Sequence, residues 1–66
     1  MDPYSVLEYL KKKVAEREKD LENVVLSGSV VDISQYKGVI GELRGLSFIR
    51  YEIRSLLEKM EKAENV

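Results

Sequence analysis

The sequence predicts an all-α protein, a two-helix antiparallel hairpin of the coiled-coil type. Two long stretches carry apolar residues at helical spacing, and a short connection around Gly28 separates them. At 66 residues the chain forms one domain at most, near the size at which a single core barely offsets chain entropy. We therefore expect the hairpin to be completed by oligomerisation or by docking on a larger assembly.

A first helix is predicted over residues 3–26. Asp2 offers an oxygen-bearing N-cap, and Pro3 suits the first helical position, where its missing N–H does no harm. Apolar residues recur at heptad spacing along this stretch, at Leu7, Leu10, Val14, Leu21 and Val24. Arg17 fills the position between the third and fourth of these. The first helix thus has one apolar seam with a single charged interruption.

The connection between the helices is predicted at residues 27–31. Gly28 suits the left-handed conformation that follows many helices. Two N-caps compete for the second helix: Ser29, with Asp32 three residues on, and Asp32, with Gln35 three residues on. Asp32 is preferred because Gln35 completes a capping box.

The second helix is predicted over residues 32–62, with a charged tail that frays. Its seam carries Tyr36, Val39, Leu43, Leu46, Arg50, Ile53, Leu57 and Met60. Pairing the two seams across the turn predicts four contacts: Val24 with Tyr36, Leu21 with Val39, Val14 with Leu46, and Leu10 with Arg50.

Two arginines, Arg17 and Arg50, interrupt the seams, one on each helix. One interpretation is that each long side chain passes the edge of the seam and reaches water. The other is that the two guanidinium groups meet carboxylates and fix the register of the helices, as polar seam residues can. The sequence leaves both open.

Three glycines mark a second face of the second helix. At about 100° per residue, with Ser34 at zero, Gly38, Gly41 and Gly45 lie at about 40°, 340° and 20°. The seam toward the first helix centres at roughly 150°, on the other side. Each glycine costs roughly 1 kcal/mol of helix propensity relative to alanine. Phe48 ends this ridge as an aromatic anchor.

The glycine ridge has two interpretations. In the first, Ser34, Gly38, Gly41, Gly45 and Phe48 form a groove for a protein partner, because missing side chains let another backbone approach closely. In the second, the glycines let the helix bend or pack tightly on the first helix. The partner groove is the preferred interpretation.

The composition argues against catalysis and against a cofactor. The chain has no histidine and no cysteine, so it lacks an imidazole base, a thiol nucleophile and a thiolate metal site. With 11 basic and 12 acidic residues its net charge is −1, which gives no electrostatic footprint for nucleic acid. No apolar run is long enough to cross a membrane. We expect a non-enzyme without cofactor or metal.

Residues 26–61 resemble a group of small helical-hairpin proteins encoded by tailed bacteriophages. The resemblance rests on Leu26-Ser27-Gly28, Asp32, Tyr36-Lys37, Gly41, Arg44-Gly45-Leu46, Glu52-Ile53 and Leu56-Leu57-Glu58. It implies no enzyme activity and suggests a virion-associated or assembly-linked role, located in the virion or the host cytoplasm.

These observations predict a non-catalytic protein–protein interaction module, a small structural or assembly component of a tailed-phage virion. Its partner would be a further copy of itself or a larger phage assembly, rather than nucleic acid or a membrane. The alternative is a phage-encoded regulatory protein that binds a host protein or nucleic acid as a helical-bundle dimer.

Overall fold

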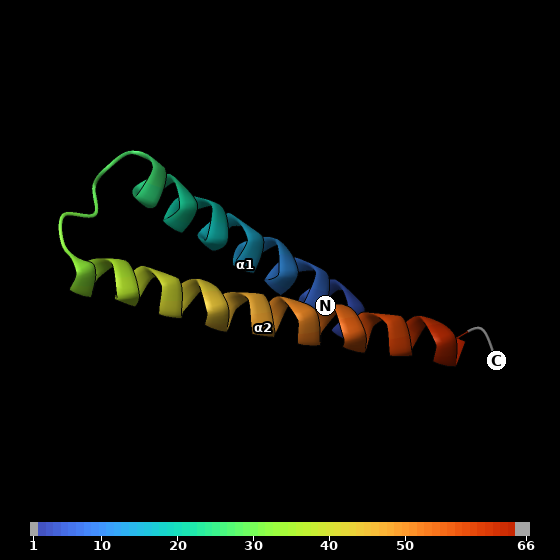
Figure 1. Cartoon of the computed structure of the whole chain (residues 1–66). Coiled ribbons are helices and arrows are strands. Elements are labelled where there is room, and N and C mark those ends of the chain that lie inside the picture. The colour runs from blue at the N-terminus through green and yellow to red at the C-terminus, as the bar shows by residue number, and fades with distance from the viewer. Residues whose placement is uncertain (1, 65–66) are drawn as a thin grey trace.

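Two long helices joined by a six-residue connection make up the fold. A computed structural model describes residues 2–64, with α1 at Pro3–Leu26 and α2 at Ile33–Glu64. The helices run antiparallel and form a rod about 52 Å long and 17 Å wide (Figure 1). The described residues contain no strand. The predicted all-helical class is therefore confirmed, and the hairpin arrangement agrees with it.

Local hydrogen bonds set where α1 begins. The Asp2 carboxylate accepts from the Ser5 backbone N–H at 2.8 Å and from the Ser5 hydroxyl at 3.1 Å. Pro3 occupies the first turn, where no intrahelical N–H is needed. The first helix thus starts where the cap residues of the sequence place it.

The end of α1 is closed by Gly28, whose φ of 76° lies in the left-handed region. The Gly28 N–H donates to the Val25 carbonyl and the Ser29 N–H to the Val24 carbonyl, both at 3.3 Å. This pair of bonds is the Schellman arrangement, which satisfies carbonyls that the helix leaves without partners. A side chain at position 28 would strain this turn.

At the start of α2, the Asp32 carboxylate accepts from the Gln35 N–H at 2.8 Å, and the Gln35 amide oxygen accepts from the Val31 N–H at 3.0 Å. Asp32 rather than Ser29 is therefore the cap, and α2 begins one residue later than predicted. α2 continues to Glu64, two residues beyond the predicted end at residue 62. The Tyr4 hydroxyl donates to Glu61 at 3.2 Å and ties this last part of α2 to α1.

The core between the helices is small: only Leu21, Ile53 and Leu57 are buried hydrophobic residues in the described chain. On α2 the packed face is the predicted seam, except that Tyr36 and Arg50 are exposed. On α1 the packed face differs from the prediction. The residues that are at least partly buried there are Tyr4, Leu7, Lys11, Val14, Glu18, Leu21 and Val25.

The prediction that Leu10 and Val24 are packed in the seam was thus wrong, and Arg17 reaches α2 only at the edge of the contact. All three are classed as exposed, while their neighbours Lys11, Glu18 and Val25 take the inward positions. Both series have heptad spacing and share Leu7, Val14 and Leu21, so the packed face has turned by about half a residue, or roughly 50°.

The register of the hairpin is also shifted. The predicted pairing of Val14 with Leu46 puts residue 13 opposite Ser47 and residue 56 opposite Tyr4. In the structure the Ser47 hydroxyl bonds to Glu18 at 3.3 Å and Tyr4 bonds to Glu61. These two contacts are displaced by five residues, from 13 to 18 and from 56 to 61, whereas Arg17 contacts Glu42, within one residue of its predicted partner position 43. The six-residue connection allows this displacement, which a tighter turn would forbid.

The two helices diverge toward the turn (Figure 1). A hollow of ≈ 520 Å³ lies between them there, bordered by Leu21 and Val24 of α1 and by Gly38 and Val39 of α2. The divergence explains why Tyr36 and Val24, which were predicted to meet, both remain more than a third exposed.

Candidate protein-binding surface

The glycine ridge lies on the outside of the hairpin. Ser34, Gly38, Gly41, Gly45 and Phe48 are all exposed. A Cβ atom built on any of the three glycines would meet no atom of the described chain within 4 Å, apart from its own helix. The glycines therefore do not serve a close approach of α2 to α1. Their side of the helix is open to another molecule.

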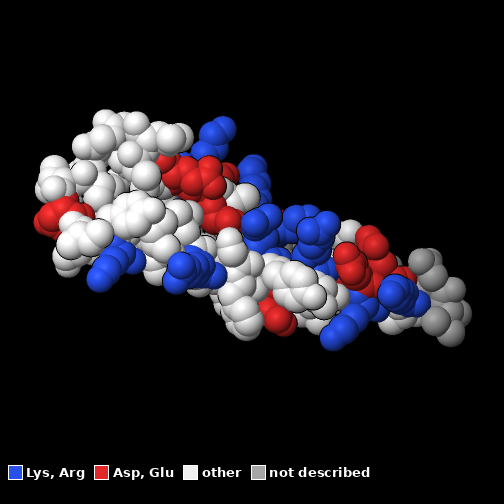
Figure 2. All heavy atoms as spheres, in the orientation of Figure 1, with Lys and Arg blue, Asp and Glu red and all other residues white. Residues whose placement is uncertain are grey.

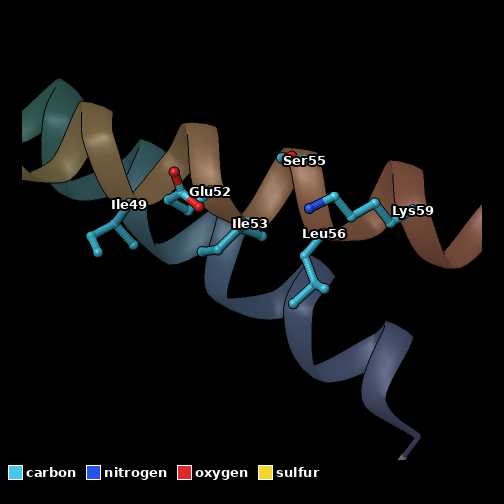
Figure 3. Close-up of a pocket in the computed structure, with 6 residues that line it drawn as sticks. All are labelled: Ile49, Glu52, Ile53, Ser55, Leu56 and Lys59. Atoms are coloured by element: carbon cyan, nitrogen blue, oxygen red, sulfur yellow. The ribbon is translucent and has the colours of Figure 1, made fainter.

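Toward its C-terminal end the same face becomes bulky. Phe48 is 63% exposed, and Ile49 and Leu56 are each 46% exposed. Ile49 and Leu56 point to the same side of α2 (Figure 3). They border a shallow hollow of ≈ 290 Å³ that Glu52, Ile53, Ser55 and Lys59 complete. We define the outer face of α2 by two groups of residues on the side away from the seam. Its small half comprises Ser34, Gly38, Gly41 and Gly45, and its bulky half comprises Phe48, Ile49, Glu52, Leu56 and Lys59.

A second apolar region covers the turn end of the hairpin. Leu26, Val31 and Ile33 are the most exposed large hydrophobic residues described, at 83%, 78% and 69%. Between Glu22 and Lys37 the sequence has one charged residue, Asp32. The space-filling view accordingly shows a largely uncharged surface at this end of the rod, whereas charges cover the rest (Figure 2).

Both seam arginines make ion pairs with the opposite helix. The Arg17 Nε donates to Glu42 Oε2 at 2.6 Å and its Nη2 to Oε1 at 3.3 Å. The Arg50 Nε lies 2.9 Å from Glu18 Oε1. Each arginine side chain is about half exposed, 54% and 47%. The guanidinium groups thus lie at the edges of the helix contact, where they reach both water and a carboxylate.

Glu18 is the buried polar residue that sequence reasoning missed. It lies outside the predicted seam of α1, yet its side chain is only 12% exposed. Its Oε2 accepts from Ser47, whereas its Oε1 accepts no hydrogen bond from a described group despite the nearby Arg50. The Arg50–Glu18 contact is therefore a charge contact with a poorly aimed N–H. Glu18 lies seven residues from both Lys11 and Val25, on a heptad series that runs beside Leu7, Val14 and Leu21. This spacing is the signal that could have placed Glu18 on the packed face.

The Arg17–Glu42 pair predicts a pH dependence of stability. The hydrogen bonds from Arg17 hold the pKa of the Glu42 carboxyl below its ordinary value of 4.5. A carboxyl with a lowered folded pKa stabilises the fold above its unfolded pKa, and this contribution is lost as the pH falls through the folded pKa. The Asp2 pKa is lowered in the same direction by the Ser5 N–H.

We expect the free energy of unfolding to decrease as the pH falls below about 4.5, the unfolded value for Glu42. Glu42→Gln should flatten this decrease, while Glu22→Gln, at an exposed position with no ion pair to a described residue, should leave it unchanged. Urea unfolding across this pH range at low salt is the measurement. Equal slopes in the two variants would contradict the assignment.

Among residues 2–64, no helix combines the length and apolarity needed to cross a bilayer. The same residues hold no cluster of three acidic side chains that could bind a metal ion. No protein-family model, curated protein or solved structure matches the chain. The function is therefore inferred from burial, charge and surface shape.

Proposed function

We propose that this chain is a non-catalytic protein–protein interaction module that acts by packing its exposed helix surfaces against another protein. The supporting observation is the distribution of its large hydrophobic residues. Among the residues that the structure describes, three are buried between the helices, whereas twelve are more than a third exposed. Burying an apolar surface is worth roughly 25 cal/mol per Å², so a partner that covers these residues gains a large driving force.

The outer face of α2 is the proposed contact surface. Its residues Ser34, Gly38, Gly41, Gly45 and Phe48 are exposed, and the absence of side chains at the three glycines permits close backbone approach. Phe48 adds an exposed aromatic side chain of the type that often dominates binding energy.

The place of action proposed for this module is the tailed-phage virion, as a structural or assembly component. This part of the proposal rests on the resemblance of residues 26–61 to phage hairpin proteins. The residues of that pattern include Gly41 and Gly45, which lie on the proposed contact surface.

Mass spectrometry of purified phage particles tests the proposal. We expect the chain at a stoichiometric copy number. The double variant Gly41→Leu/Gly45→Leu should stay folded, because leucine has the higher helix propensity, but should be lost from particles. Arg54→Leu is the matched control: it adds the same side chain at an exposed position about 180° away from the glycines and should be retained.

Absence of the wild-type chain from particles, with recovery only alongside a host protein, would overturn the virion role in favour of the regulatory alternative. Normal incorporation of the double leucine variant would contradict the assignment of the contact surface.

A further inference from the structure

We propose that the outer face of α2 binds a second copy of the same chain, antiparallel, with a twofold axis between Gly45 and Phe48. This inference rests on the proposed interaction function and names its partner. It follows from three observations: the distribution of small and large residues along α2, the unpaired charges beside them, and the total exposed area of the chain.

The first observation is that small and large residues are segregated along the outer face. Its N-terminal half carries Ser34, Gly38, Gly41 and Gly45, and its C-terminal half carries Phe48, Glu52, Leu56 and Lys59. In a parallel pair the glycine halves would approach closely, but Phe48 would meet Phe48 and Leu56 would meet Leu56, which holds the bulky halves apart. In an antiparallel pair Ser34, Gly41 and Gly45 each meet a large residue, and Gly38 lies between Ser55 and Leu56 of the other copy.

Only one antiparallel register pairs the two halves completely. The small half ends at Gly45 and the bulky half begins at Phe48, so the twofold axis must lie between them. Phe48 then packs over Gly45 of the other copy, Glu52 lies opposite Gly41, and Lys59 lies opposite Ser34. A twofold interface requires this reciprocity, since each contact occurs twice.

The second observation concerns charge. Glu52 is the one acidic residue at the centre of the bulky half, and it makes no ion pair with another described residue. Lys37 and Arg44 flank Gly41 on the small half and likewise have no ion pair within the described chain. The antiparallel register brings Glu52 of one copy between these two cations of the other.

The third observation is the exposed area. The chain exposes 5256 Å². A globular monomer of its 7.6 kDa mass would expose roughly 4,300 Å². The excess, roughly 1,000 Å², is close to the ~800 Å² that each partner buries in a standard stable interface. The hairpin therefore has enough surplus surface for one such interface per copy.

A single spin label distinguishes the orientations. The chain has no cysteine, so Ser34→Cys carries the only label. Labels at position 34 of an antiparallel dimer with this axis are separated by 25 helical residues, or roughly 38 Å, whereas a parallel dimer brings them within about 20 Å. Double electron–electron resonance measures this distance, and analytical ultracentrifugation of the unlabelled chain measures the mass.

Substitutions at the axis test the contact itself. Gly45→Leu should raise the dimer dissociation constant about tenfold to a hundredfold, because leucine collides with Phe48 of the other copy. Adding Phe48→Ala should recover most of this loss by returning the space. Arg54→Leu should leave the dissociation constant within about twofold, since that position lies on the opposite side of α2.

A monomer at millimolar concentration, a 34-to-34 distance below about 20 Å, or equal effects of Gly45→Leu and Arg54→Leu would each overturn the inference. These outcomes are separable from the proposed function. A chain that is monomeric when purified but present in phage particles retains the interaction function and loses only the second copy as its partner.

Discussion

Replacing Leu57 by alanine should unfold most of the hairpin at room temperature. Leu57 is 6% exposed and is one of only three buried hydrophobic residues described, with Leu21 and Ile53. Removing a buried leucine side chain costs about 2–5 kcal/mol. A chain of this size rarely gains more than about 3–5 kcal/mol from its core, so the loss approaches the entire stability.

Leu26→Ala is the matched control for this prediction. It is the same chemical change at a position that is 83% exposed, and it should alter the unfolding free energy by less than about 0.5 kcal/mol. Far-ultraviolet circular dichroism with urea titration at high dilution measures both variants. A Leu57→Ala protein as stable as Leu26→Ala would show that the two helices do not pack through the seam described.

Removing the partner of Glu18 should produce the second large effect. In Arg50→Ala, the Glu18 carboxylate stays buried and keeps only its bond from Ser47. The substitution removes the counter-charge of the buried carboxylate, and we expect a loss of at most about 3 kcal/mol, the low end for a broken buried pair, because the Arg50 side chain is itself 47% exposed. Glu18→Leu should instead be neutral or stabilising, because apolar replacement of a buried ionic group often is.

Arg54→Ala provides the comparison for Arg50→Ala. Arg54 is 69% exposed and its Nε lies 3.9 Å from Glu58 on the same helix, a surface pair worth at most about 0.5 kcal/mol. Urea unfolding of the two arginine variants and of Glu18→Leu separates the contributions. Equal losses for Arg50→Ala and Arg54→Ala would mean that Glu18 is hydrated in solution.

Most of the fold could be predicted from the sequence, and the reason is that helix ends depend on nearby residues. The Asp2 cap, the left-handed Gly28 and the Asp32 cap each act through hydrogen bonds that span three to five residues. The α1 range of the structure, Pro3–Leu26, coincides with the predicted one. The observed end of α2, Glu64, lies two residues beyond the predicted end at residue 62.

The candidate surface could be predicted only in part. The helical spacing placed the three glycines and Phe48 on the side of α2 away from the seam, and all four are exposed in the structure. The structure adds that Ile49 and Leu56 extend this face and that Leu26, Val31 and Ile33 are uncovered at the turn end. Those exposures depend on how far α1 reaches and on the divergence of the helices.

The sequence by itself determined the number of helices, where α1 begins and ends, and the side of α2 that carries the glycines. The tertiary structure decided which face of α1 meets α2 and in which register. Two heptad series on α1 share Leu7, Val14 and Leu21, and the more apolar one is not the one that packs. The choice between them depends on contacts such as Glu18 with Ser47 and Arg50, which lie about thirty residues apart in the chain and exist only once the helices have met.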